Sequence, residues 1–211
     1  MTLRPTNKSK VKKRPSFIEE ARRKQVLDIA IQTIATQGFR NTSIEHIAAK
    51  AGVSKGVIYY HFNGKRELVG HIWIALIDEL HEYRKVRVDA QCSATEKLGA
   101  YVEAQFEFLR TNIKKFVALF DAGIDLTSED GSNPWSATFD ERCFKYLAQI
   151  LSSGQKSGEF GEFSPNILAP VIQGGIDGIG LQWISYPEGV DLDGCKRELL
   201  EIIKVYTTRK K

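Results

Sequence analysis

The segment 42–62 constrains what this chain can fold into more than any other. It consists of two short amphipathic stretches, TSIEHIAAKA and VSKGVIYYHF, separated by Gly52. Thr42 and Glu45 have the spacing of a capping box that opens a helix, and Ser54 is suited to cap a second one. Two helices of about two turns, joined by a turn that contains glycine, are typical of a helix-turn-helix. Helices shorter than about 12 residues are marginal in water, so both must pack against neighbouring helices.

Apolar residues at helical spacing predict these neighbours. One helix is expected from Glu19 to Gln37, with Gly38 just past its end. Another starts near Gly64 and runs to about Val88, long enough at 1.5 Å per residue to span roughly 36 Å. No segment shows the alternation of a strand, so we expect an all-α protein of about nine helices. The further helices are expected at 95–111, 114–127, 135–157, 166–185 and 191–208.

The charge of the chain is divided unevenly. Residues 1–66 contain 14 lysines and arginines and 4 aspartates and glutamates, a formal net charge of +10. Residues 67–211 contain 16 lysines and arginines and 22 aspartates and glutamates, a formal net charge of −6. A basic segment on an acidic body is typical of a protein that places its first part against a polyanion. We therefore divide the chain into a flexible basic arm (1–16), a helix-turn-helix domain (17–66) and a helical body (67–211).

Several classes of protein are excluded by composition and motifs. No stretch approaches the roughly 20 apolar residues of a membrane helix, and the basic start lacks the apolar core of a secretory signal, so we expect a cytoplasmic protein without a membrane partner. The chain has no HExxH, GxSxG or phosphate-loop motif, and we expect neither an enzyme nor a cofactor. The cysteines lie roughly 50 residues apart without paired histidines. We expect no disulfide and no metal site, but reduced thiols packed as small hydrophobes, at Cys92, Cys143 and Cys195.

At residues 26–68, VLDIAIQTIATQGFRNTSIEHIAAKAGVSKGVIYYHFNGKREL, the chain resembles the DNA-binding head of the TetR family of bacterial transcriptional regulators. The core AGVSKGVIYYHF is the specific part of the match. One departure is the turn Asn63-Gly64-Lys65, where the family more often has a serine before the lysine. The resemblance implies a sequence-specific regulator of transcription, a repressor that a small-molecule effector releases from a palindromic operator. The alternative is an architectural DNA-binding protein with weak sequence preference.

The second short helix is the segment expected to enter the major groove. Lys55 can donate to guanine O6 or N7, the ring of Tyr59 can contact a thymine methyl group, and Gly56 allows close approach of the backbone. The resemblance agrees with these roles and implies phosphate contacts around them. The alternatives to these DNA contacts are that His61 only packs at the corner after the helix and that the arm makes no contact with DNA. The candidate DNA-binding residues are Thr42, Ser43, Ser54, Lys55, Gly56, Tyr59, Tyr60, His61 and Lys65, with Lys12, Lys13 and Arg14 on the arm.

The body is rich in aromatic residues, of which about half must belong to the core. The resemblance implies that the body holds a small-molecule pocket and forms a homodimer through residues 166–208, where several glycines would let a second helix approach. Asp121 and Asp125, one turn apart, either favour a cationic ligand or form a solvated acidic face. The candidate ligand-binding residues are Phe106, Phe116, Phe120, Asp121, Phe144 and Trp183.

The arm generates the first prediction. Replacing Lys12, Lys13 and Arg14 with glutamine should reduce the slope of log Kd against log salt concentration by up to about 0.9 for each lost phosphate contact. The slopes are measured by titrating a labelled DNA duplex at several salt concentrations. Equal slopes for the two proteins would show that the arm does not touch DNA.

Overall fold

The computed structural model describes residues 16–126 and 134–208, with side chains for residues 16–122 and 141–208. Within these ranges the chain is all-α, as predicted, and each expected helix is found within two residues of its predicted bounds. The helices are α1 (Phe17–Gln37), α2 (Ile44–Ala51), α3 (Lys55–His61), α4 (Lys65–Asp89), α5 (Ala94–Thr111), α6 (Ile113–Leu126), α7 (Pro134–Ser157), α8 (Pro165–Ser185) and α9 (Leu192–Thr207).

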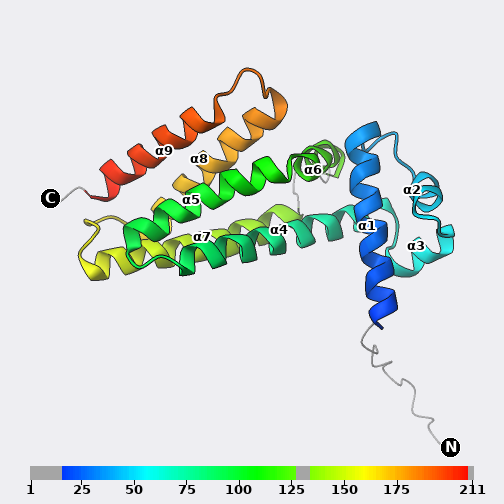
Figure 1. The fold of residues 1–211 in the computed structure, drawn as a ribbon, viewed down its shortest axis with the longest axis horizontal. Helices are drawn as coiled ribbons and strands as arrows, with labels where there is room; N and C mark the ends of the chain where they lie inside the picture. The colour runs from blue at the N-terminus through cyan, green and yellow to red at the C-terminus, as the bar shows by residue number, and fades with distance from the viewer. Residues whose placement is uncertain (1–15, 127–133, 209–211) are drawn as a thin grey trace, which may run out of the picture.

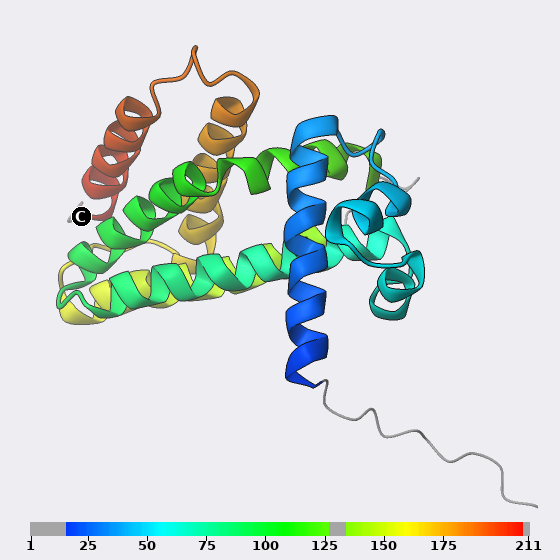
Figure 2. The same cartoon turned by 45° about the vertical axis from the view of Figure 1, so that its right-hand side comes forward.

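The helices form a small head and an elongated body (Figure 1). In the body, α4 and α7 run along the long axis with α5 beside them, and α8 and α9 form a hairpin on α5. In the head, α1 crosses the start of α4 steeply, and α2 and α3 lie at the end of the molecule far from the C-terminus (Figure 2). None of the helices in the described ranges is long and apolar enough to cross a membrane.

The head has a core that extends into the body. Its centre is the apolar face of α1, where Val26 and Ala30 are 0% exposed. Helices α2, α3 and α4 pack on this face, and α6 closes it from the side of the body. The residues that these four helices contribute include Ile47, Ile58, Leu68, Ile72, Ala118, Leu119 and Ala122. The head is therefore not separated from the body by a solvent-filled gap, because both use the same buried cluster.

The cap of α2 differs from its prediction. The hydroxyl of Ser43 accepts the backbone N–H of His46 at 3.1 Å, so Ser43 is the N-cap. Thr42 is 2% exposed and donates its hydroxyl to the carbonyl of Gly38 at 2.8 Å. The predicted capping box of Thr42 and Glu45 is thus wrong. Gly38 ends α1 with a φ of 80°, and the chain then turns so that Thr42 faces the end of α1.

The turn between α2 and α3 follows the prediction. Gly52 has a φ of 64° and ends α2 in the left-handed conformation, which suits glycine because it has no Cβ. Val53 is partly buried against the core of the head. Ser54 occupies the N-cap position of α3, although its hydroxyl makes no capping hydrogen bond.

Carboxylates cap the longer helices. In α1, Ser16 and Glu19 form a capping box, which is why this helix begins at Phe17, two residues before its predicted start. In α5, Ser93 and Glu96 form a second one. A further carboxylate reaches α5 from the end of α7, because Glu159 accepts the backbone N–H groups of residues 94 and 95 at 3.0 and 2.9 Å.

The three cysteines have different surroundings. Cys143 is 0% exposed, as predicted, but its thiol also accepts hydrogen bonds from Arg84, and Cys195 is partly buried. Cys92 is exposed, so the same prediction is wrong for this residue. It lies in the short loop between α4 and α5, outside the apolar stripes of both helices.

The cap of α5 predicts a pH-dependent contribution to stability. The N–H groups of Ala94 and then Thr95 lower the pKa of Glu159 from 4.5 to about 2. Because the carboxylate is the capping form, its contribution is complete above pH 4.5 and disappears as the pH falls toward 2. Glu159→Gln should therefore have a lower Tm than the wild type at pH 7, and the difference should shrink over that acidic range.

Thermal unfolding followed by circular dichroism at several pH values checks this prediction. Glu188→Gln, which removes the same charge from an exposed turn, serves as the control and should match the wild type throughout. A difference for Glu159→Gln that does not change with pH would contradict the capping role.

Candidate DNA-binding site

Two buried side chains fix the orientation of α3. Ile58 is 0% exposed and Phe62, directly after the helix, is 1% exposed. They are four residues apart and therefore lie on one face of the helix, against α1, α2 and α4. The opposite face of α3 must then point into solvent. The exposed residues on it are Lys55, Gly56, Tyr59 and Tyr60.

An ion pair holds Lys55 across the surface of the head. Its Nζ donates to Oε1 of Glu45 on α2 at 3.0 Å, and both side chains are more than half exposed. This hydrogen bond raises the pKa of Lys55 and lowers that of Glu45. Lys55 is therefore kept charged and extended toward α2. Lys55 can contact a base or phosphate either with the other N–H groups of its ammonium or after it leaves the carboxylate of Glu45.

Tyr60 connects α3 to the beginning of α1. Its hydroxyl donates to Oε1 of Glu19 at 3.2 Å, which raises the pKa of Tyr60. Glu19 also closes the capping box with Ser16, so the start of α1, where the arm joins the chain, lies next to the exposed face of α3. His61 is partly buried, with the rings of Tyr60 and Phe62 at centroid distances of 5.0 and 6.1 Å.

The loop between α1 and α2 is held from two sides. Nζ of Lys65 donates to the carbonyls of Phe39 and Thr42 at 2.7 and 2.8 Å, and it lies 3.9 Å from the centroid of the Phe39 ring. From α6, the carboxylate of Asp121 accepts the backbone N–H of Phe39. Phe39 thus has a partner from α4 on its carbonyl and a partner from α6 on its N–H. The ammonium group of Lys65 is part of the structure of the head.

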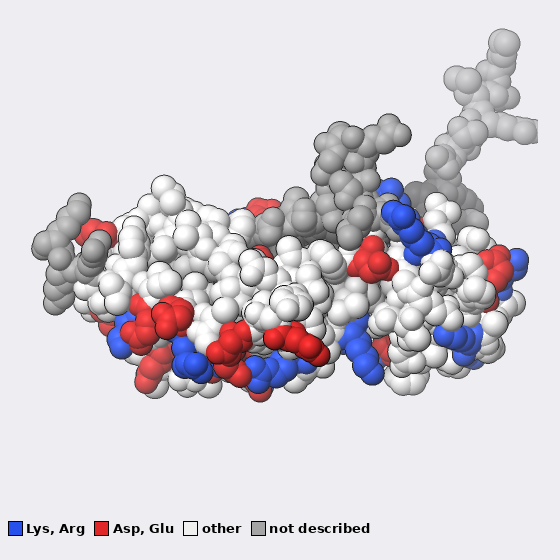
Figure 3. Space-filling model, turned by 90° about the horizontal axis from the view of Figure 1, so that it is seen from above, with Lys and Arg blue, Asp and Glu red and all other residues white. Residues whose placement is uncertain are grey.

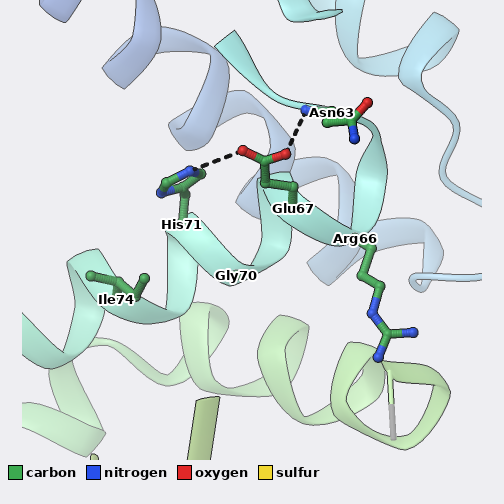
Figure 4. Close-up of a pocket in the computed structure, with 6 residues that line it drawn as sticks. All are labelled: Asn63, Arg66, Glu67, Gly70, His71 and Ile74. Atoms are coloured by element: carbon green, nitrogen blue, oxygen red, sulfur yellow. Dashed lines mark hydrogen bonds and ion pairs between the residues drawn. The ribbon is translucent and has the colours of Figure 1, made fainter. Parts of the chain in front are cut away.

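A shallow pocket of about 380 Å³ lies at the start of α4 (Figure 4). Gly64 at the N-cap has no side chain to cap the helix, and the carboxylate of Glu67 accepts the N–H of Asn63 at 2.9 Å instead. The same carboxylate lies 3.6 Å from Nε2 of His71, whose pKa is lowered by burial. These contacts stabilise the turn that follows α3. The pocket is lined by Asn63, Arg66, Glu67, Gly70, His71 and Ile74.

The candidate DNA-binding residues therefore fall into three groups. The four exposed residues of α3 and the exposed Ser54 lie together on the outside of the head. Thr42 and Lys65 make part-buried hydrogen bonds within the head, Ser43 makes an exposed capping hydrogen bond, and His61 is partly buried. Lys12, Lys13 and Arg14 lie outside the described residues. Sequence reasoning did not find Glu19 and Glu45, because their partners are 41 and 10 residues away.

Several basic side chains on the body are paired with acidic ones. Acidic and basic residues alternate along one edge of the body in Figure 3. Arg142 pairs with Asp78 at 2.6 Å, and Arg110 pairs with Asp193 at 2.9 Å. The body thus offers a surface of mixed charge, which is less suited to a polyanion than a basic one.

The candidate ligand-binding residues have three kinds of surroundings. Phe106 is buried in the core of the body, and Trp183 packs against the same cluster. Phe116 packs against the core of the head, with its ring 6.2 Å from that of Phe108. The remaining residues are Phe120, which is exposed, Phe144, which is half-buried, and Asp121, which binds the N–H of Phe39. No group of three histidine, cysteine or acidic side chains in the described part of the chain is placed to hold a metal.

Comparisons with known proteins give the family. Residues 26–72 match the family model of bacterial regulatory proteins of the tetR family. The fatty acid metabolism regulator protein of Bacillus subtilis is 24% identical over 196 residues, which cover 90% of this chain and 95% of that protein. The HTH-type transcriptional regulator TtgR of Pseudomonas putida is 29% identical over 189 residues, which cover 83% of this chain and 87% of that protein.

The fold of the whole chain agrees with this match. A crystal structure of a transcriptional regulator from Saccharomonospora viridis, in complex with choline, superposes with a TM-score of 0.75 at 23% identity. The superposition covers 90% of this chain and all of the other. Head and body are therefore both shared with proteins of this kind. The chain belongs to the TetR family of bacterial transcriptional regulators, and its helix-turn-helix binds DNA.

Proposed function

We propose that this regulator is a cytoplasmic repressor that binds a palindromic operator as a homodimer and leaves it when a small molecule binds the body. The observation that carries the proposal is the orientation of α3. With Ile58 and Phe62 buried, the helix presents a lysine, a glycine and two tyrosines to solvent. Exposed aromatic rings beside a cation on a protruding helix suit the edges and methyl groups of bases in a major groove.

The exposed residues divide into base and phosphate contacts. Lys55 donates to a guanine after exchanging its Glu45 partner, Tyr59 contacts a thymine methyl group, and Gly56 lets the backbone approach. Phosphate contacts come from the residues around them, which fix the position of the head on the duplex without choosing a sequence. This second group consists of Ser43, Ser54, Tyr60 and His61. Lys65, whose ammonium group holds the carbonyls of Phe39 and Thr42, and the buried Thr42 shape the loop that carries Ser43.

The role of Lys55 can be tested with Lys55→Ala. Loss of a base contact of this kind weakens specific binding by about 1–3 kcal/mol, roughly 5-fold to 150-fold in Kd, and relaxes the choice of base at one position. The operator is first selected from random duplexes with the wild-type protein. Kd values for the selected and a random duplex are then measured by fluorescence anisotropy.

Lys114→Ala is the matched control, because it removes an exposed lysine from α6 in the body. Equal binding by the two variants would contradict the role of α3. A wild-type protein that binds the selected and random duplexes equally would favour the architectural alternative.

One face of α8 supports the homodimer. Ile167 and Val171 are 68% and 65% exposed, and Gly174 and Gly178 continue the same face at helical spacing with open space around them. Gly175 and Gly180 differ, since a Cβ there would lie 3.3 Å from Leu199 and 3.1 Å from Leu109 of the same chain. The apolar face adjoins further exposed hydrophobic residues on α9, namely Ile202, Val205 and Tyr206. Residues 166–208 thus offer two helices that can form a four-helix bundle with those of a second chain.

Gly178→Leu tests this interface. Within one chain the new side chain meets no atom within 4 Å of its Cβ, so the monomer should fold normally, while the approach of a second helix is blocked. We expect the dimer to dissociate at concentrations at least about tenfold higher than for the wild type, which corresponds to a loss of about 1.4 kcal/mol in the free energy of dimerisation. DNA binding should be lost in parallel.

Light scattering after gel filtration measures the mass of the species, and anisotropy measures DNA binding. Gly99→Leu, at another open glycine in a helix, is the control. A Gly178→Leu monomer that binds the operator as tightly as the wild type would contradict the proposal.

The connection between body and head supports release by an effector. Helix α4 is 25 residues long and continuous from the head into the body. Helix α6 shares the core of the head and binds the N–H of Phe39. A change in the body that moves either helix would shift the two heads of the dimer away from the spacing of roughly 34–36 Å between successive major grooves. The effector would bind among the aromatic residues of the body, with Phe106 and Trp183 as part of its surroundings.

A further inference from the structure

One charged side chain lies inside the core of the body. Arg84 belongs to α4 and is 1% exposed. It continues a stripe of buried residues at intervals of four, in which the other members are apolar. Arginine stays protonated at every physiological pH, so a full positive charge is buried here. No carboxylate among the described side chains forms an ion pair with it. The apolar members of the stripe are Ile72, Leu76, Leu80 and Val88.

The groups around the guanidinium are neutral. Nη1 of Arg84 donates to the hydroxyl of Tyr101 at 3.0 Å, and Nη1 and Nη2 both lie 3.3 Å from Sγ of Cys143. Burial raises the pKa of the Cys143 thiol, and it raises that of Tyr101 well above its usual range, although the guanidinium opposes both shifts. Both groups therefore keep their protons at neutral pH. Among the side chains that the structure describes, the guanidinium has hydrogen-bond partners but no carboxylate in direct contact.

The nearest carboxylate in this network is reached only through two neutral groups. The hydroxyl of Tyr101 donates to Oε1 of Gln173 at 2.6 Å, and Nε2 of Gln173 donates to Oδ1 of Asp177 at 2.8 Å. Asp177 is exposed on α8. This chain of hydrogen bonds turns a lone pair of Tyr101 toward Arg84, and among the described side chains it brings no carboxylate into direct contact with the guanidinium.

The cluster also contains unused hydrogen-bonding atoms. Within the described residues, the buried side-chain atoms without a partner are Nε of Arg84, Nδ1 of His81 and the hydroxyl of Tyr146. The ring of Tyr146 lies 5.7 Å from that of His81 and 6.1 Å from that of Tyr101, and the guanidinium of Arg84 lies 4.7 Å from the centroid of the Tyr101 ring, so the three residues are neighbours. An unsatisfied buried polar atom is destabilising, because it has lost its hydrogen bonds to water without gaining others. One of these atoms belongs to the buried cation itself and the other two to its neighbours, so a bound ligand could supply the partners that they lack.

His81 and Tyr146 indicate where such a ligand enters. His81 precedes Arg84 by one turn on α4, and Tyr146 follows Cys143 by one turn on α7. Both side chains are partly exposed, whereas Arg84 and Cys143 are buried. The pair therefore lies along the contact between α4 and α7, nearer the surface than the guanidinium.

We propose that Arg84, with Tyr146 and His81, binds the carboxylate of an organic acid that has an apolar body. The inference rests on the proposed function, since this acid would be the effector. A carboxylate can accept the Nε–H of Arg84 and the hydroxyl of Tyr146, and it supplies the missing negative charge. A neutral head group would leave the charge unmatched, and a cationic one would add to it. The apolar body of the acid would be in contact with residues of the surrounding core, such as Leu147, Leu151, Ile172 and Ile176.

The variant Arg84→Met tests the site without removing the fold. Replacing a buried charge that lacks a counter-ion by an apolar side chain of similar length is often neutral or stabilising, so its Tm should equal or exceed that of the wild type. The probes are decanoate, palmitate and 1-naphthoate, with decan-1-ol and decyltrimethylammonium as neutral and cationic counterparts. At least one of the acids should raise the Tm of the wild type more than either counterpart, and its Kd by calorimetry should rise at least tenfold in Arg84→Met. Arg110→Met, at an exposed arginine paired with Asp193, should bind the acid like the wild type.

Two readouts separate this inference from the proposed function. The acid should release the wild-type protein from its selected operator, while Arg84→Met should bind the operator and stay bound. Acid binding in a protein that has no preferred duplex would contradict the proposed function and leave the site intact. Equal affinity of the wild type and Arg84→Met for every acid would overturn the proposed site. If the Tm of Arg84→Met were also much lower than that of the wild type, the role of Arg84 would be structural.

Discussion

The burial of Ile58 and Phe62 is the contact on which the function of the head depends. Helix α3 has only seven residues, and a helix of this length does not persist in water by itself. Its conformation and its rotation about its own axis both come from the two side chains that enter the core. Because they fix one face inward, Tyr59 and Tyr60 have to face solvent. The exposed aromatic residues are thus a consequence of packing on the opposite side of the helix.

That same core joins the head to the body. Helix α6 contributes to the cluster around α1, and Asp121 of α6 binds the backbone of Phe39 in the loop that leads to α2. Lys65 at the start of α4 holds the carbonyl of the same residue. Phe39 is therefore fixed by the two helices that connect head and body. A movement of either one is transmitted to the loop before α2 through direct hydrogen bonds and not through a flexible linker.

The interior of the body contains a feature that works against stability. An apolar side chain at Arg84 would complete the buried stripe of α4 and would leave no unpaired charge. The guanidinium is held by hydrogen bonds to Tyr101 and Cys143 and lies 4.7 Å from the centroid of the Tyr101 ring, but its Nε has no partner, which binding of an anion would supply. Proteins commonly accept destabilising groups where they bind ligands. The carboxylate of Asp121, which the sequence suggested for a cationic ligand, is instead occupied by the N–H of Phe39.

The sequence by itself determined the helices and the face of α3 that is exposed, because both follow from the spacing of apolar residues within a few turns. It was less accurate where two neighbouring residues compete for one role, as Thr42 and Ser43 do for the cap of α2. A local signal for Arg84 was present, since this residue interrupts a stripe of apolar residues at intervals of four. Only the tertiary structure decided which groups meet it, because Tyr101 and Cys143 are 17 and 59 residues away and come from other helices. Contacts over such separations depend on how helices pack, and the periodicity within one helix does not contain that information.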